Sequence, residues 1–180
     1  MGGSPDFFEK RDGMIYWTLF THQDWTFILA ATEKGLCFTG SESQDEKELF
    51  EWAGKRRKGM ELKRDDGRLF PYVEQFREYF DGERDALDVP LDVEGTDFQQ
   101  QVWRALQAIP FGELRCYGDI AEAIGKPTAV RAVGAAIGAN PVMVTIPCHR
   151  VIGKNGSLTG FRGGLSMKQR LLQLERNRGL

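Results

Sequence analysis

Near the start of the chain, three short apolar runs are separated by polar turn residues. The runs span residues 14–20, 26–31 and 35–38, and the polar clusters between them lie at 22–24 and 33–35. Apolar runs of this length, bounded by turn residues, are typical of neighbouring strands joined by tight connections. The pattern therefore predicts a three-stranded antiparallel sheet.

Apolar residues recur at helical spacing in the next two segments, 46–53 and 71–80, with a basic loop at 55–58 between them. This spacing predicts two helices after the sheet. Residues 84–95 then alternate apolar and other side chains, which indicates a final strand or an extended linker. The alternating apolar residues are Leu87, Val89, Leu91 and Val93.

The strongest helix signal begins at Thr96. Thr96 is suited to an N-cap and Asp97 to the positive end of a helix, and one broad apolar face continues until residues 110–112, Pro-Phe-Gly, end it. We therefore expect a boundary near residues 92–96 that divides the chain into domains at 1–92 and 93–180.

Two short helices are predicted beyond this one, and together they make a helix-turn-helix pattern. The first covers 120–124 and ends before Gly125, and the second covers 129–137 after Pro127. Arg131 is the only charge on the second helix, which is otherwise rich in Ala and Gly. A helix with such a smooth surface, made of small side chains, can pack tightly in a core. It can also approach a DNA groove closely.

The composition is that of a folded chain without a membrane-spanning segment. Of 180 residues, 41% are hydrophobic and 28% are charged, which excludes a disordered chain. The least polar stretch, 129–147, is interrupted too early to supply the roughly 20 apolar residues of a membrane helix. Charged residues between 6 and 12 occupy the place of a signal peptide's apolar region. We expect a cytoplasmic protein.

The two halves of the chain differ in charge. Residues 96–180 carry 11 basic and 5 acidic residues, a formal charge of +6, whereas residues 1–95 carry 13 basic and 21 acidic residues, a formal charge of −8. A basic half beside an acidic one suggests that only the second half faces a polyanion. Charges scattered over a solvated surface are an equally good explanation of the same counts.

Three cysteines, Cys37, Cys116 and Cys148, cannot all pair, which favours a reducing compartment. A buried structural role is the ordinary interpretation of the first two. Cys148 differs because His149 and Arg150 follow it directly. A base and positive surroundings lower the pKa of a thiol and make it nucleophilic.

Sequence adjacency does not bring Cys148 and His149 into contact. The segment before them, 142–146, is predicted to be a buried strand, and neighbouring side chains on a strand diverge. A local turn or a bridging water would be needed to join them. The alternative is a structural cysteine beside an exposed histidine.

In its second half the chain resembles the O6-alkylguanine-DNA alkyltransferases, also called methylated-DNA–protein-cysteine methyltransferases. The matching segments occur in one order, and their residues are 95–99, 102–103, 109–113, 117–118, 131–134, 140–141, 146–152, and 163–165 through 171–172 to 175. The resemblance implies an α+β chain. Its first domain would be a ribonuclease H-like antiparallel sheet with helices, and its second a winged-helix, DNA-binding domain.

The family resemblance also implies a reaction. The protein would bind duplex DNA, rotate an O6-alkylguanine, and also an O4-alkylthymine, out of the stack, and move the alkyl group to Cys148 in one displacement. The thioether would be stable, so each molecule would act once. No cofactor or metal is implied. The partner would be damaged duplex DNA and no membrane, with a monomeric protein and a possible cooperative assembly on DNA.

By the same analogy, a relay activates the cysteine. Glu175 would orient His149, and His149 would draw the proton from Cys148 through a water. Asn140 would tie the recognition helix to the active-site strand, and Tyr117 would hydrogen-bond to the guanine and improve it as a leaving group.

The remaining roles implied by the family concern DNA and the rotated base. Arg131 would take the vacated place in the base stack. The pocket for the base would be formed around Val151, Phe161 and Arg162. Further DNA contacts would come from the residues Tyr117, Ala129, Gly134 and Lys154.

Three departures from the family pattern stand out. Cys116 occupies a position where a hydroxyl residue is usual, and Arg162 one where a small residue is usual, so Arg162 would change the size of the pocket. The structural zinc site of some relatives is missing, because His22 and Cys37 are the only candidates near the N-terminus and cannot make a four-ligand site.

Other functions fit parts of the sequence. A winged-helix regulator explains the charge division but not Cys148 with His149 and a distant Glu175, and its recognition helix would lack the polar residues that read base edges. A base-flipping sensor would lack the cysteine. A Cys-His hydrolase would need an oxyanion-hole signature, which is not evident.

Overall fold

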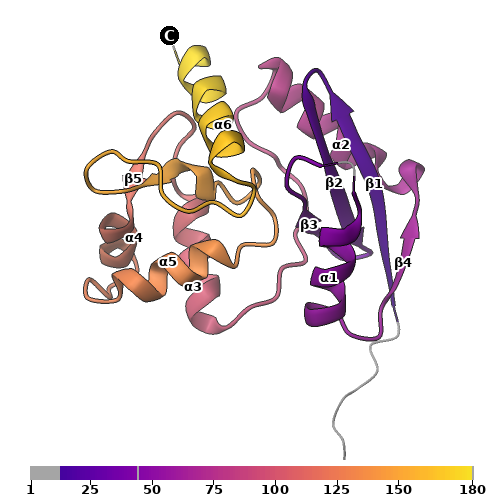
Figure 1. The fold of residues 1–180 in the computed structure, drawn as a ribbon, viewed down its shortest axis with the longest axis horizontal. Helices are drawn as coiled ribbons and strands as arrows, with labels where there is room; N and C mark the ends of the chain where they lie inside the picture. Colours follow the sequence, from indigo (N-terminus) through magenta and orange to yellow (C-terminus); the bar gives the residue numbers. More distant parts are fainter. Residues whose placement is uncertain (1–12, 44, 180) are drawn as a thin grey trace, which may run out of the picture.

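A computed structural model describes residues 13–43 and 45–179. Its N-terminal part is built on a four-stranded sheet in the order β3-β2-β1-β4, on the right in Figure 1. The strands are β1 (Met14–His22), β2 (Trp25–Thr32), β3 (Gly35–Thr39) and β4 (Glu61–Arg64). The first three form the predicted antiparallel meander. The charged segment before residue 13, used above to exclude a signal peptide, lies outside the described residues.

The fourth strand was not predicted, and it makes the sheet mixed rather than wholly antiparallel. β4 pairs in parallel with β1, with Ile15 opposite Leu62. Three of its four residues are exposed and charged, so its sequence is that of a polar loop. Charged side chains are usual on an edge strand because they discourage pairing with other chains.

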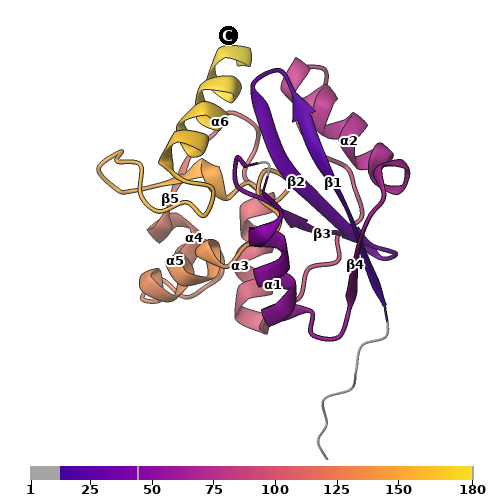
Figure 2. The same ribbon diagram turned by 45° about the vertical axis from the view of Figure 1, so that its right-hand side comes forward.

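Two helices cover opposite faces of this sheet (Figure 2). Side chains along β2 alternate between the two faces, so each helix packs against a different set of them. Helix α1 (Lys47–Arg56) packs on the face of Ile28, and α2 (Asp66–Asp81) packs on the face of Phe27. The predicted start of α2 at residue 71 was wrong. The Asp65 carboxylate accepts a hydrogen bond from the amide of Arg68 and caps the helix earlier, so Pro71 lies inside it.

The C-terminal part is mainly helical. Its elements are α3 (Asp97–Gln107), β5 (Arg115–Cys116), α4 (Tyr117–Ala123), α5 (Val130–Gly138), a 3₁₀ turn (Cys148–Arg150), β6 (Val151–Ile152) and α6 (Leu165–Arg178). Thr96 caps α3 as predicted, since its hydroxyl accepts from the amide of Gln99 and the Gln99 side chain accepts from the amide of Thr96. Helices α4 and α5 form the predicted helix-turn-helix, and Gly125 between them has φ of +73°.

The expected strand at 142–146 is instead a buried turn. The amide of Ile146 donates to the carbonyl of Val142 at 3.0 Å, and Val144 has φ of 72°. The Asn140 side chain closes the turn at both ends: its Nδ2 donates to the Ile146 carbonyl and its Oδ1 accepts from the Val142 amide. The apolar sequence here reflects burial rather than an extended backbone.

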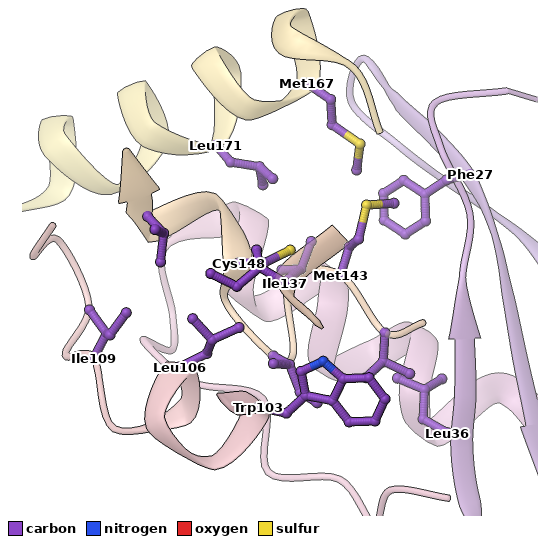
Figure 3. Close-up of a cluster of buried hydrophobic side chains, with 14 of the residues drawn as sticks. Phe27, Leu36, Trp103, Leu106, Ile109, Ile137, Met143, Cys148, Met167 and Leu171 are labelled. Carbon is purple, nitrogen blue, oxygen red and sulfur yellow. The ribbon is translucent and has the colours of Figure 1, made fainter. Parts of the chain in front are cut away.

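The sheet and the C-terminal helices share one hydrophobic core. Phe27 and Leu36 from the sheet belong to the same cluster as Trp103, Leu106 and Cys148 (Figure 3). The segment 84–95 joins the two parts in an extended conformation, with one isolated parallel bridge between Leu91 and Leu36. Among the described residues, no helix is both long and apolar enough to cross a membrane.

Candidate active site

Cys148 lies at the centre of the molecule rather than on its surface. Its side chain is 4% exposed and is packed among residues from α3, α5 and α6 (Figure 3). The turn 142–146 leads into the 3₁₀ turn that carries Cys148, His149 and Arg150. This local turn separates the three neighbouring side chains and directs them to different partners.

His149 is paired with a carboxylate on the last helix. Its Nε2 lies 2.7 Å from Oε1 of Glu175, and both side chains are 1% exposed or less. An ionised carboxylate can only accept, so Nε2 carries the proton and Nδ1 presents a lone pair. Nδ1 is buried and has no hydrogen-bond partner among the described residues. His149 is therefore oriented as a base.

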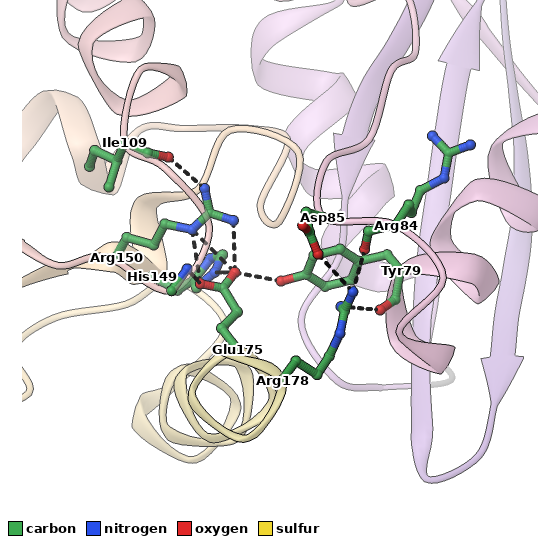
Figure 4. A network of polar contacts seen from close by, with 9 residues as sticks. Tyr79, Arg84, Asp85, Ile109, His149, Arg150, Glu175 and Arg178 are labelled. Atoms are coloured by element: carbon green, nitrogen blue, oxygen red, sulfur yellow. Dashed lines mark hydrogen bonds and ion pairs between the residues drawn. The ribbon is translucent and has the colours of Figure 1, made fainter. Parts of the chain in front are cut away.

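Glu175 accepts hydrogen bonds from several groups besides His149 (Figure 4). Arg150 binds it in a bidentate manner, with Nε 3.0 Å from Oε2 and Nη2 2.8 Å from Oε1. Tyr79 donates to Oε1 at 2.6 Å, and the amide of Gly112 donates to Oε2. Burial on its own raises the pKa of Glu175, but the hydrogen bonds from His149 and Arg150 outweigh it and hold the pKa well below its usual range. Glu175 is thus a fixed anion.

The pKa of Cys148 does not follow the expectation that positive neighbours lower it. Burial raises the pKa of the thiol, and a hydrogen bond from the Asn140 side chain and the charges of Arg162 and Lys168 only partly oppose this. Burial likewise lowers the pKa of His149, against the effect of Glu175. Arg150 is directed at Glu175, not at the thiol. The resting site therefore holds a neutral thiol and a neutral imidazole.

A groove of roughly 600 Å³ lies between α5 and the segment 159–162. It is lined by Tyr117, Gly134, Ile137, Gly138, Thr159, Gly160, Phe161 and Arg162. The hydroxyl of Thr159 donates to that of Tyr117 at 3.0 Å and joins the two walls. The groove is mostly apolar, with the Tyr117 hydroxyl as a polar group on one wall. Val151 is buried in β6 and does not line this groove.

Arg162 lines the groove, but its guanidinium is directed at the N-terminal sheet. It donates to Glu48 at 2.6 Å and to the carbonyl of Thr39 at 2.6 Å, and it lies 5.1 Å from the centre of the Phe38 ring. The sequence suggested that this arginine would change the size of the pocket. Its contacts show that it anchors the segment 159–162 to the other part of the molecule.

The residues expected to contact DNA lie on the surface. Arg131 is exposed on α5, and its guanidinium makes no hydrogen bond or ion pair with any residue that the structure describes. Lys154 is exposed beyond β6. Ala129 precedes α5 and is partly exposed, as is Gly134 beside the Tyr117 ring. Cys116 is half-buried, and its thiol lies 3.8 Å from the carbonyl of Gly153.

Two functional candidates were not found from the sequence. Lys168 is 1% exposed, and its Nζ donates to the carbonyls of Val151 and Thr159, at 2.5 and 2.8 Å, so it holds β6 to the groove wall. Its helical spacing with Leu171 and Glu175 was an available signal. Tyr79 offered no such signal in the sequence, because it lies among the aromatic core residues of α2. No cluster able to hold a metal occurs within residues 13–43 and 45–179.

Comparisons with known proteins show which family the chain belongs to. The model of the 6-O-methylguanine DNA methyltransferase DNA-binding domain matches residues 97–177, and that of the ribonuclease-like domain of the same methyltransferase matches residues 15–93. The chain belongs to the 6-O-methylguanine DNA methyltransferase family. The α+β fold, with its sheet domain and its helical DNA-binding domain, is the fold of this family.

Individual relatives are similar over almost their whole length. The inducible methylated-DNA–protein-cysteine methyltransferase of Bacillus subtilis is 56% identical over 93% of this chain and 94% of its own. The corresponding protein of Methanosarcina barkeri is 42% identical over 91% and 98%. The crystal structure of Mycobacterium tuberculosis OGT in complex with DNA has a TM-score of 0.77 at 40% identity, covering 91% of this chain and 94% of that one.

Proposed function

We propose that this protein repairs DNA directly, by moving the alkyl group of an O6-alkylguanine, or of an O4-alkylthymine, from duplex DNA to Cys148. The observation that carries the proposal is a buried thiol on the same turn as His149, whose Nε2 is held by Glu175 and whose Nδ1 is free to accept a proton. Membership of the methyltransferase family and the DNA complex of the M. tuberculosis relative support it.

The chemical step is a single displacement. His149 takes the thiol proton, directly or through a water, and the imidazolium that forms is stabilised by the Glu175 carboxylate. The sulfur attacks the alkyl carbon, the carbon–O6 bond breaks, and its electron pair remains on the base. Tyr117 donates a hydrogen bond to the leaving guanine. In this step the alkyl group passes directly from the base to the sulfur, so no cofactor is needed, and because the thioether is stable each molecule reacts once.

The neutral thiol of the resting site fits this single use. Burial favours the protonated form of Cys148, and in the proposed reaction the thiolate forms when His149 accepts the proton. A thiol that is protonated until then is protected from oxidation and from other electrophiles, since the thiolate is the reactive form.

Binding is assigned to the exposed side of the helix-turn-helix. The smooth surface of α5 would lie against DNA, with Ala129 and Gly134 allowing close approach, and Lys154 would contact a phosphate. Arg131 would enter the stack where the damaged base leaves it. The rotated base would occupy the groove beside Phe161 and Arg162, with Val151 behind it.

We also propose the division into domains 1–92 and 93–180, a monomeric protein that can assemble cooperatively on DNA, and a cytoplasmic location. The family models, which end at 93 and begin at 97, support the division.

Intact-protein mass spectrometry after incubation with duplex O6-methylguanine DNA tests the function. We expect one added methyl group per molecule and, by peptide mapping, its location on Cys148. Cys148→Ala should bind the same DNA without gaining mass, while Cys116→Ser, which changes a half-buried thiol, should react normally. Methylation of Cys37 or Cys116, or repair of more lesions than there are protein molecules, would contradict the mechanism.

A further inference from the structure

Among the described residues, one side chain of the sheet domain donates a hydrogen bond to Glu175 of the proposed relay. Tyr79, on α2, is 1% exposed, and its hydroxyl donates to Oε1 of Glu175 at 2.6 Å (Figure 4). Oε1 is also the oxygen that pairs with Nε2 of His149. A residue 96 positions away in the sequence therefore shares an acceptor atom with the base of the proposed relay.

The position of Tyr79 is fixed from several sides. Arg178, on α6, donates to the Tyr79 carbonyl at 2.8 Å, and its guanidinium also lies over the rings of Tyr79 and Phe111. The Tyr79 and Phe111 rings pack edge to face, with centroids 6.1 Å apart. The hydroxyl is thus held against the carboxylate by contacts that involve the main chain and the ring, not only by its own hydrogen bond.

The hydroxyl can act only as a donor here. Burial and the Glu175 charge raise the pKa of Tyr79 well above its ordinary value, so it stays protonated. A donor on Oε1 withdraws charge from the atom that His149 uses, and it restricts rotation of the carboxylate. Two positive groups, Arg150 on the turn and Lys168 on α6, lower the pKa of His149.

We propose that Tyr79 is a positioning residue of the transfer reaction, by which the N-terminal domain sets the orientation of Glu175 and the basicity of His149. The inference rests on the relay described under the proposed function. It assigns the sheet domain a part in the chemistry in addition to its part in the shared core.

The test compares single-turnover transfer rates of the full chain with those of Tyr79→Phe, Glu175→Gln and the double variant. Tyr79→Phe keeps the ring and removes only the hydroxyl. We expect a loss of about three- to tenfold, because the loss of a fixed Glu175 orientation outweighs the higher basicity of His149. The loss should be equal for duplex DNA and for the free base O6-benzylguanine, because the relay acts on Cys148 itself. In the double variant, Tyr79→Phe should cost nothing beyond Glu175→Gln, because its effect passes through that carboxylate.

A spectroscopic measurement separates positioning from a general structural role. The chain has two histidines, so proton NMR gives one ring N–H signal to follow for each. Without the Tyr79 donor, Oε1 carries more charge, and the His149 Nε2–H signal should move downfield. His22 pairs with Asp81, on the same helix as Tyr79, and its signal should stay in place unless the helix itself is disturbed.

Tyr72→Phe is the matched control, since it removes a hydroxyl from the same helix away from Glu175. It should react at the wild-type rate. An unmoved His149 signal, an additive loss in the double variant, or an equal loss in Tyr72→Phe would overturn the role of Tyr79 while leaving the relay intact. A wild-type rate in Glu175→Gln would overturn the relay and this inference together.

Discussion

Glu175 and Arg131 both carry charge, and the structure surrounds them in opposite ways. Glu175 is 1% exposed and accepts hydrogen bonds from His149, Arg150, Tyr79 and the amide of Gly112. Arg131 is exposed, and its guanidinium has neither a hydrogen bond nor an ion pair with any other described residue. Groups assigned to proton transfer are fixed before substrate arrives, whereas the group assigned to the DNA stack is left free to move.

The two proposed roles, proton transfer and replacement of the rotated base, explain why Glu175 is held by hydrogen bonds and the Arg131 side chain is not. Proton transfer depends on geometry within a few tenths of an ångström, so orienting bonds formed during folding lower the barrier at no cost during the reaction. A side chain that replaces a rotated base must instead find its position only when DNA is bound. Bonding Arg131 to a protein carboxylate would compete with that contact.

The largest effect on activity short of removing the thiol is expected from the relay. His149→Ala or Glu175→Gln should slow transfer by roughly an order of magnitude or more, as loss of a general base typically does. Because the defect lies in the interior, it should be the same for duplex DNA and for free O6-benzylguanine in single-turnover assays. Unchanged rates in both variants would remove the relay from the mechanism.

A smaller and selective effect is expected at the surface. Arg131→Ala should slow repair of duplex DNA, where the base must leave its stack, by about tenfold or less, since rotation costs a few kcal/mol and the arginine offsets only part of it. Reaction with the free base should be normal. Arg131→Lys should restore binding more than repair, because a planar guanidinium stacks between bases and an ammonium does not.

Two other results would assign Arg131 differently. Uniformly weaker binding to every duplex, with a salt dependence reduced by about one unit, would mean a phosphate contact. An equal loss with duplex DNA and free base would mean that Arg131 supports the groove rather than the DNA stack.

The sequence predicted the elements whose signals are local. Thr96 with Asp97 marks the start of α3, and Gly125 marks the turn between α4 and α5, because caps and left-handed turns depend on a few adjacent residues. Strand β4 was not predicted because this polar segment is a strand through its pairing with β1, which is far away in the sequence. The turn at 142–146 was predicted as a strand because apolar composition reports burial and not backbone conformation.

The site was predictable to the same extent. Cys148, His149 and Glu175 were identified from a motif and a family resemblance, and the structure brings the last two together. The bonds that complete the network could not be predicted. Tyr79 has the sequence environment of any core aromatic residue, and only the packing of α2 against α6 makes it a donor to Glu175.

The smallest effect that we expect is a difference between the buried network and the surface in how folding stability depends on pH. The pKa of His149 is lower in the folded protein than in the unfolded chain, where it is about 6.5. Between these two pKa values, the unfolded chain binds more protons than the folded protein. Stability should therefore fall as the pH drops below about 6.5. Glu175, whose pKa is also lowered, extends the decline below about pH 4.3, where the unfolded carboxylate takes up protons.

Urea unfolding at pH 7.5 and pH 5.5 measures the histidine contribution. The free energy of unfolding should be lower at pH 5.5 in the wild type, and His149→Gln, which cannot titrate, should show a smaller decrease between the two pH values. Arg131→Ala serves as the surface control and should keep the wild-type difference, because it leaves the buried His149 and Glu175 unchanged. If the free energy of unfolding changed equally between the two pH values in wild type and His149→Gln, the buried imidazole would not govern acid stability. The buried network would then not differ from the surface in its effect on acid stability.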